Sequence, residues 1–93
     1  MAIIRRIRER VLAREYYLSA HAEEEMWADD LERSDVESAI MKGHVEKKMT
    51  RDPRGTRYRI EGPARDGRLI HVVCRLTARS LLLVTVYALR DES

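Results

Sequence analysis

Apolar residues in the first part of the chain follow the spacing of one face of an α-helix. This set comprises Ile3, Ile4, Ile7, Val11 and Leu12. Arginines fill most of the positions between them, as expected for a helix that buries one side and leaves the other in water. The pattern predicts an amphipathic helix over residues 1–16, ending near Tyr16, followed by a short extended link at Tyr17 and Leu18.

Two more helices are predicted in residues 17–43. Ser19 is suited to be an N-cap, because its hydroxyl can accept a hydrogen bond from a free backbone N–H of the first turn. Ser34 followed by Glu37 is the pattern of a capping box and predicts the start of the next helix. Gly43 is expected to end that helix.

After Gly43 the apolar residues alternate, which is the pattern of half-buried strands. Strands are predicted over residues 44–49, 57–61, 69–77 and 81–89. Turns are expected at D-P-R-G, residues 52–55, and at Asp66-Gly67. The chain therefore predicts an α+β fold in a single domain, residues 1–93, with N-terminal helices packed on one face of a curved antiparallel meander of about four strands over residues 44–89.

The register of the last hairpin decides which side chains the helices leave uncovered. A three-residue loop at 78–80 would place His71 opposite Tyr87, whereas a loop of two or four residues would move Tyr87 to the helix side. We choose the three-residue loop. The uncovered face then carries Arg57, Arg59, His71, Arg75, Thr85 and Tyr87. The same choice leaves Leu81, Leu83 and Leu89 on this otherwise polar side.

Composition narrows the class of protein. Charged residues make up 37% of the chain, the net charge is +2, and most of the basic residues are arginine, which suits an anionic partner. The single cysteine, Cys74, fits a reducing compartment. The absence of a long apolar run gives no membrane span or secretory signal. We expect a cytoplasmic protein, and the sequence shows no fingerprint of a cofactor.

The uncovered face is a candidate RNA-binding surface, with Arg57, Arg59, Arg75 and His71 as the nucleic-acid-binding residues. Arginine neutralises phosphates, and bases stack on aromatic or guanidinium planes. Catalysis is a further option, because His or Tyr can move a proton and Arg can stabilise charge on phosphorus. The structural alternative is a solvated sheet face, since antiparallel sheets commonly leave one side wet.

His21 and Glu25 lie one helical turn apart and could form an acid/base pair or bind a metal; the alternative is a capped helix that carries an exposed ion pair. His71 and Cys74 have a ligand-like spacing, but residues three apart on a strand point to opposite faces and cannot share an ion. We therefore predict no metal site and expect Cys74 in the core.

Four motifs resemble the bacterial domain of unknown function 4258: L-S-A-H-A-E-E-E-M, D-D-L-E-R-S-D-V-E-S-A-I-M-K-G, D-P-R-G-T-R-Y-R-I-E-G and the closing L-V-T-V-Y. The resemblance runs from about Tyr17 to Leu89. That family looks similar to the RelE/ParE and BrnT type of small toxin. The resemblance implies helices on a curved antiparallel sheet and an origin in toxin–antitoxin modules, whose toxins often cleave RNA and are held by an antitoxin.

The resemblance also transfers individual residues. The histidine of the family's H-A-x-x-R-M motif falls on His21, and its D-V pair falls on Asp35 and Val36. Two arginines common in that helix fall on Glu25 and Asp29, so positive charge is replaced by negative. RelE-like ribonucleases draw on Arg, Lys and Tyr of the sheet, and such chemistry would sit at Arg57, Arg59, Arg75 and Tyr87.

Three hypotheses follow. The first is a toxin-like protein that binds, and cuts, RNA, with His21, Arg75 and Tyr87 as the catalytic residues and RNA and an antitoxin as partners. The second is a non-catalytic module that docks an acidic protein or forms a homodimer, with Leu81, Leu83 and Leu89 at its interface. The third, ranked last, is a metal-dependent hydrolase that acts through His21 and Glu25.

Overall fold

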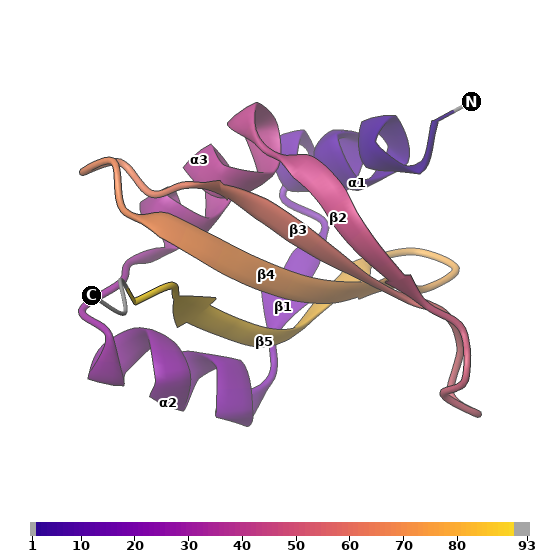
Figure 1. Cartoon of the computed structure of the whole chain (residues 1–93). Coiled ribbons are helices and arrows are strands. Elements are labelled where there is room, and N and C mark those ends of the chain that lie inside the picture. Colours follow the sequence, from indigo (N-terminus) through magenta and orange to yellow (C-terminus); the bar gives the residue numbers. More distant parts are fainter. Residues whose placement is uncertain (1, 91–93) are drawn as a thin grey trace.

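The computed structural model of the chain describes residues 2–90. Within this part it has three helices and five strands. In chain order these are α1 (Ile3–Leu12), β1 (Tyr16–Leu18), α2 (Ala20–Ala28), α3 (Arg33–Lys42), β2 (His44–Met49), β3 (Arg57–Pro63), β4 (Leu69–Leu76) and β5 (Leu81–Ala88) (Figure 1). The α+β class is confirmed, and the four expected strands are joined by a fifth, β1.

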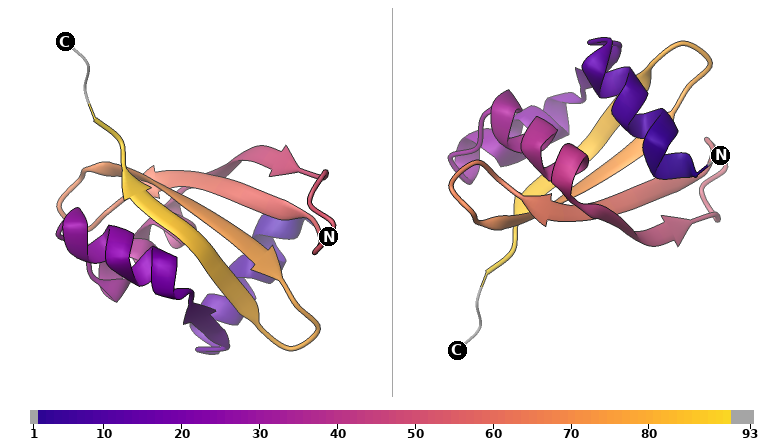
Figure 2. Two further views of the ribbon diagram at one scale, coloured as in Figure 1. Left: turned by 90° about the horizontal axis from the view of Figure 1, so that it is seen from below. Right: turned by 90° about the horizontal axis from the view of Figure 1, so that it is seen from above.

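The strands form one sheet in the order β1-β5-β4-β3-β2. All neighbouring strands run antiparallel except β1, which pairs with β5 in parallel over Tyr16–Leu18. α1 and α3 lie behind the sheet in Figure 1, and α2 runs along the β5 side (Figure 2). No helix within residues 2–90 is long and apolar enough to span a lipid bilayer.

The core lies between the sheet and the helices. Its largest fully buried side chains come from α1, α3 and the strands β3, β4 and β5, and they are Ile7, Val36, Ile40, Ile60, Ile70, Val72, Cys74, Leu81, Leu83 and Val86. Aliphatic residues supply this layer, as the absence of phenylalanine requires. The opposite face of the sheet has no helix over it among the described residues and is called the open face below (Figure 1).

Helix α1 ends at Leu12, earlier than the expected end near Tyr16. Arg14 adopts a left-handed conformation, with φ 58°, and the N–H of Glu15 donates to the carbonyl of Arg10. This pair of features is a Schellman-type end, which turns the chain sharply. The turn frees Tyr16–Leu18 to become β1 and leaves Leu12 69% exposed, although it was predicted on the buried side.

The N-terminal cap of α2 agrees with the prediction from the sequence, whereas the cap of α3 differs from it. Ser19 caps α2 as predicted, accepting a hydrogen bond from the N–H of Ala22 at 3.0 Å. The capping box of α3 is formed by Glu32 and Asp35 instead of Ser34 and Glu37. Glu37 instead accepts a hydrogen bond from the hydroxyl of a β1 tyrosine. The expected box was wrong because α3 begins at Arg33, which places Ser34 inside the helix instead of at its N-cap.

The β4–β5 hairpin has a four-residue loop, not the three-residue loop that we chose. Near the loop Leu76 pairs with Leu81, but a register shift between Val73 and Cys74 leaves Val84 as an extra residue in β5. Beyond this β-bulge His71 lies opposite Tyr87 and Val73 opposite Thr85, as predicted. The loop length was therefore wrong and the register at Tyr87 is confirmed.

The bulge changes which leucines reach the core. Before it, Leu81 and Leu83 point toward the helices and are fully buried, which corrects their expected place on the polar face. After it, the core side is taken by Val86 and the open side by Tyr87. Leu89, still 36% exposed, lies just past the end of β5. The interface proposed for the docking module therefore loses two of its three leucines.

Helix α3 and strand β3 approach each other through two glycines. A Cβ on Gly62 would lie 2.2 Å from the carbonyl oxygen of Ala39, and a Cβ on Gly43 would lie 2.2 Å from the carbonyl oxygen of Glu61. Both obstacles are backbone atoms, so neither can rotate away. Gly43 does end α3, but this contact rather than a left-handed conformation accounts for the glycine, because its φ is −90°.

We expect Gly62→Ala to lower the free energy of unfolding by about 1–3 kcal/mol or more, the usual cost of forcing atoms into a packed core. Urea denaturation followed by circular dichroism measures the change. Gly67→Ala is the comparison, since a Cβ there meets nothing within 4 Å and only its positive φ of 94° is strained. A smaller loss for Gly62→Ala than for Gly67→Ala would contradict this account of the contact.

Candidate functional site

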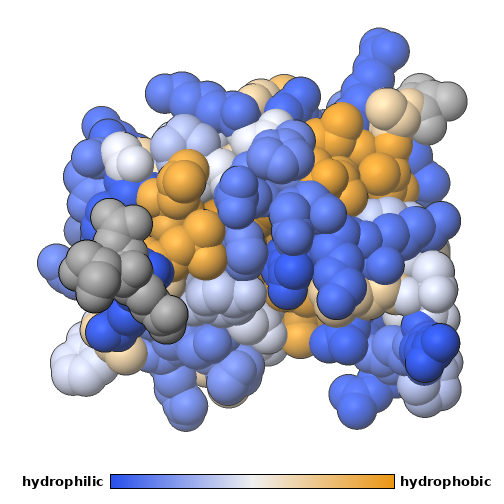
Figure 3. All heavy atoms as spheres, in the orientation of Figure 1, coloured by the Kyte–Doolittle hydropathy of each residue, from blue (hydrophilic) through white to orange (hydrophobic). Residues whose placement is uncertain are grey.

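The open face gathers polar side chains from three adjacent strands. Alternation along β3, β4 and β5 places on it Arg57, Arg59, Glu61, His71, Val73, Arg75, Thr85 and Tyr87. Figure 3 shows this face with hydrophilic residues over most of its centre and hydrophobic clusters beside them. All the arginines predicted for RNA binding, and Tyr87, are therefore on one side of the sheet, as is His71.

Across the middle of the face, Glu61, His71 and Tyr87 form one row of paired residues. His71 Nε2 lies 3.0 Å from Glu61 Oε1, and His71 Nδ1 lies 2.9 Å from the Tyr87 hydroxyl. The imidazole and phenol rings pack edge to face, with their centroids 5.3 Å apart. His71 is only 8% exposed although it lies on the uncovered side. Both of its nitrogens are thus engaged by neighbours.

The carboxylate of Glu61 sets the direction of this row. An ionised carboxylate only accepts hydrogen bonds, so the proton of the neutral imidazole is assigned to Nε2. His71 Nδ1 then accepts from the Tyr87 O–H. This arrangement can take a proton from Tyr87 onto His71, with Glu61 stabilising the imidazolium that forms. The row is therefore a continuous hydrogen-bonded path from the Tyr87 hydroxyl to the Glu61 carboxylate, on the face that no helix covers.

Arg59 lies beside this row and is paired with Glu46 of β2. Its Nε and Nη2 donate to the two Glu46 carboxylate oxygens at 2.5 and 3.1 Å. The hydrogen bond from Glu46 raises the pKa of Arg59, and the nearby Tyr87 oxygen adds to the effect. In return Arg59 lowers the pKa of Glu46 below its usual value. The guanidinium charge stands next to the phenol oxygen that would become negative.

Arg57 and Arg75 share a different carboxylate. Asp52, in the loop between β2 and β3, places Oδ2 3.0 Å from Arg75 Nη2 and 3.2 Å from Arg57 Nε. The D-P-R-G turn forms as predicted, with the N–H of Gly55 donating to the Asp52 carbonyl at 3.0 Å. The N–H of Arg54, with help from Arg75 and Arg57, holds the pKa of Asp52 below its usual value. The arginines of the face thus form two groups, since Arg59 pairs with Glu46 whereas Arg57 and Arg75 share Asp52.

Within the described part of the chain, His21 shares no polar contact with the other two predicted catalytic residues, Arg75 and Tyr87. It is exposed on α2, and its Nε2 lies 3.2 Å from Glu25 Oε1. Arg75 bonds to Asp52, and Tyr87 bonds to His71. The structure records no polar contact, within residues 2–90, that joins these three groups to one another.

Glu25 contacts the sheet as well as His21. Its Oε1 accepts a hydrogen bond from the N–H of Val86 at 3.1 Å, and Asp29 Oδ2 accepts from the N–H of Ala88 at 2.9 Å. These are free N–H groups on the outer edge of β5, beyond the end of β1. These two acidic side chains therefore satisfy the edge of the sheet.

Metal-ligating residues do not cluster in the part of the chain that the structure describes: no group of three His, Cys, Asp or Glu side chains lies close enough to hold an ion. Cys74 is buried on the core side of β4, opposite to His71 on the open side, and burial raises the pKa of its thiol to about 12. A neutral buried thiol of this kind is a packing residue.

Three residues of the site were absent from the sequence-based set. Glu61 could have been included, because alternation places it on the same side as Arg57 and Arg59. Glu46 sits at a register shift between Val45 and Lys47 that the alternation of β2 does not reveal. The D-P-R-G motif predicts only that Asp52 begins a turn, and a turn motif does not indicate which side chains the aspartate will contact.

The family model for a domain of unknown function (DUF4258) matches residues 18–88 of the chain. The chain belongs to this family. The DUF4258 match begins at the end of β1 and ends with β5, so it includes the whole open face and leaves α1 outside. Comparisons with curated proteins and with solved structures gave no significant match. The DUF4258 assignment thus carries no activity with it, and function has to be argued from the site.

Removal of the Glu25 carboxylate should destabilise this DUF4258 protein, because the N–H of Val86 loses its acceptor. We expect Glu25→Ala to lower the free energy of unfolding by about 1–3 kcal/mol, the cost of an unsatisfied buried donor. Hydrogen exchange of the Val86 amide should quicken in the same variant. Glu24→Ala, at an exposed neighbour, is the control and should change stability by less than about 0.5 kcal/mol. Equal losses in the two variants would show that the edge contact is not stabilising.

The lowered pKa values of Glu46 and Asp52 predict an acid-sensitive fold. Carboxyls with depressed pKa values in the folded state stabilise it above their usual values of 4.5 and 3.8, and that stability is lost as pH falls through the lowered values. Unfolding free energies measured from neutral pH to pH about 2 should decrease below pH about 4. Glu46→Gln should show a shallower decrease, and an identical pH profile would be inconsistent with the Arg59 pair.

Proposed function

We propose that the open face binds single-stranded RNA and that Tyr87 and His71 cleave it. The observation that carries the proposal is the row Glu61–His71–Tyr87. Burying an imidazole is costly unless both nitrogens are hydrogen-bonded, and a merely solvated sheet face has no need for one. Here the buried imidazole is satisfied on both sides and ends in a tyrosine hydroxyl next to a guanidinium.

The chemistry proposed for this row is transesterification of an RNA phosphodiester. Tyr87 passes its proton to His71 Nδ1 and accepts the proton of a ribose 2′-hydroxyl, whose oxygen forms a new bond to phosphorus. The bond from phosphorus to the 5′-oxygen breaks, and this oxygen takes a proton from a water molecule. The hydroxide that remains removes the added proton from His71 and so restores the row. Arg59 stabilises the negative charge on the phosphoryl oxygens, while Glu61 stabilises the imidazolium. The products are a 2′,3′-cyclic phosphate and a 5′-hydroxyl end.

Arginines of the same face would supply affinity. Arg57, Arg59 and Arg75 each hold a carboxylate now, and an RNA phosphate would have to exchange with it. Such exchanges favour guanidinium groups, because their planar fork fits a phosphate as well as a carboxylate. His21 does not take part in this scheme.

A role as the toxin of a toxin–antitoxin module is part of the proposal and rests on the likeness of the DUF4258 family to the RelE/ParE and BrnT type of toxin. An antitoxin would then act by covering the open face and blocking Tyr87. Of the rival hypotheses, the docking module has lost two leucines to the core, and a hydrolase acting through His21 and Glu25 would need a carboxylate that already binds the edge of β5.

The test combines binding and cleavage of a short single-stranded RNA. Fluorescence anisotropy at salt concentrations from about 50 to 200 mM should show affinity that falls with salt, and Arg59→Ala/Arg75→Ala should reduce the salt slope by about 1.4, the value for two lost phosphate contacts. Tyr87→Phe should keep the affinity and reduce the cleavage rate by about 10²–10⁴-fold, the usual contribution of a positioned proton carrier.

Arg5→Ala/Arg6→Ala, on exposed positions of α1, is the matched control because it removes the same charge from a different element. It should change RNA affinity much less than the sheet variant does. Equal effects of the two double variants would overturn the binding surface, and full cleavage by Tyr87→Phe would overturn the catalytic role while leaving binding in place.

A further inference from the structure

A strongly basic pocket lies beside the loop between β2 and β3, at the end of the sheet away from α2. Its volume is about 700 Å³, and five cationic side chains and one carboxylate line it: Lys47, Lys48, Arg51, Arg54, Arg57 and Asp52. These six side chains carry a net charge of +4, which is more than the net charge of +2 of the whole chain. Such a concentration of charge attracts anions.

Asp52 already shows how an anion is held there. Its carboxylate lies against the guanidinium groups of Arg57 and Arg75, and its side chain is 12% exposed. Arg57 Nε and Arg75 Nε are buried and, among the described residues, make no hydrogen bond. The 3.2 Å contact of Arg57 Nε with Asp52 is therefore an ion pair without good alignment. One aspartate does not neutralise the pocket, and the Nε of Arg57, which lines it, is left without a hydrogen bond within residues 2–90.

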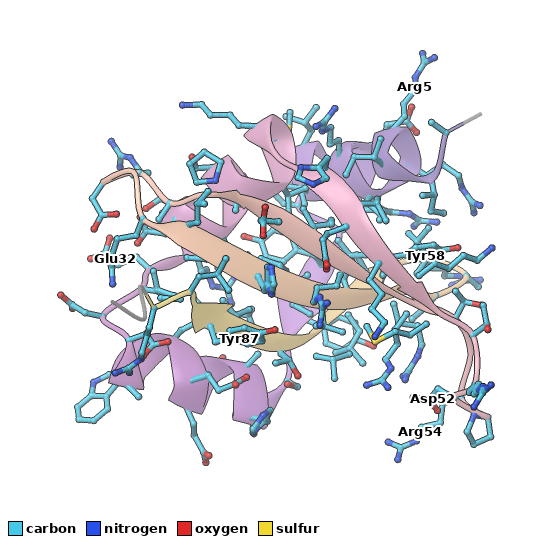
Figure 4. The ribbon with its side chains drawn as sticks, viewed as in Figure 1. Arg5, Glu32, Asp52, Arg54, Tyr58 and Tyr87 are labelled. Carbon is cyan, nitrogen blue, oxygen red and sulfur yellow. The ribbon has the colours of Figure 1, made fainter. Side chains whose placement is uncertain are left out.

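We propose that this pocket binds the terminal phosphate of an RNA strand and that Asp52 is an internal competitor for the same two arginines. A terminal phosphate carries up to two negative charges and three free oxygens, whereas an internal phosphodiester carries one charge, so the former suits a pocket with surplus cations better. Asp52 and Arg54 lie at the loop tip, well separated from Tyr87 in Figure 4. A strand whose end occupies the pocket would run across the open face toward Tyr87. The choice of RNA as the ligand rests on the proposed function.

The first experiment compares three forms of one short RNA, bearing a 5′-phosphate, a 3′-phosphate or no terminal phosphate. We expect one phosphorylated form to bind at least about 10-fold more tightly than the unphosphorylated form. Arg51→Ala/Arg54→Ala should abolish this preference, while Arg5→Ala/Arg6→Ala should leave it unchanged. Equal affinities for the three RNAs, or a preference that survives in Arg51→Ala/Arg54→Ala, would overturn the site.

The second experiment uses inorganic phosphate and needs no RNA, so it separates a failure of the pocket from a failure of the proposed function. In nuclear magnetic resonance titrations the side-chain Nε–Hε signals of Arg57 and Arg75 should shift together, because phosphate displaces one carboxylate from both. Shifts confined to the signals of α1 arginines would overturn the pocket even if RNA binds elsewhere on the face.

Asp52→Asn tests the competitor role. The asparagine oxygen can still accept from the N–H of Arg54 and keep the turn, but it no longer carries the charge that holds the two arginines. We expect the variant to bind phosphate and the preferred RNA several-fold more tightly. Equal or weaker affinity would overturn the competitor role. If the variant does not fold, joint movement of the Arg57 and Arg75 signals in the unmodified protein decides the point, since independent movement contradicts a shared carboxylate.

Discussion

The extra residue at Val84 determines the arrangement of the sheet around it. Alternation along a strand assigns each side chain to one face, so a single inserted residue reverses the assignment beyond it. In β5 this reversal places Leu81 and Leu83 in the core on one side of the bulge and Tyr87 on the open face on the other. If the same residues paired regularly from Leu81 onward, with no bulge, Tyr87 would point toward the helices and His71 would lose its partner.

Helix α2 holds the bulge in place from outside the sheet. The Ser19 hydroxyl donates to the Val84 carbonyl at 2.8 Å, and the Ser19 N–H donates to the Leu83 carbonyl at 3.0 Å. Farther along, Glu25 and Asp29 accept from alternate N–H groups of the same strand. One residue therefore caps the helix and secures the bulge, and the helix then covers an edge that would otherwise present unpaired donors.

Much of the fold follows from the sequence, because its signals are local. The alternation after Gly43 identified four strands close to their observed bounds, and the D-P-R-G and Asp66-Gly67 turns lie between them as expected. The identity of the open face was also predicted, although through a loop that is one residue too short. The β1 segment was predicted only as an extended link at Tyr17 and Leu18, because three residues give too little pattern to show that they pair with β5.

The candidate site was predictable only in part, since its charges find their partners through tertiary contacts. Arg57, Arg59 and Arg75 were placed on the correct side, but nothing local indicates that Asp52 would reach two of them or that Glu46 would take the third. The resemblance of His21 to a family motif drew attention to α2. In α2 the neighbouring Glu25 accepts a hydrogen bond from the edge of β5, whereas the buried histidine of the site is His71.

The bulge also makes the β4–β5 hairpin respond unequally to insertions and deletions. Loss of one residue between Thr77 and Ser80 would only shorten the connection, and loss of Val84 would return β5 to regular pairing with Tyr87 still opposite His71. Loss of one residue between Leu81 and Leu83 would instead turn a buried leucine to the open face. Evolutionary gaps should therefore be tolerated in the connection and at the bulge, and selected against in the paired part of β5. When relatives of this chain are aligned, a gap placed a few positions away from the connection or the bulge would match core residues with surface residues, and the position of Tyr87 would look variable through misalignment alone.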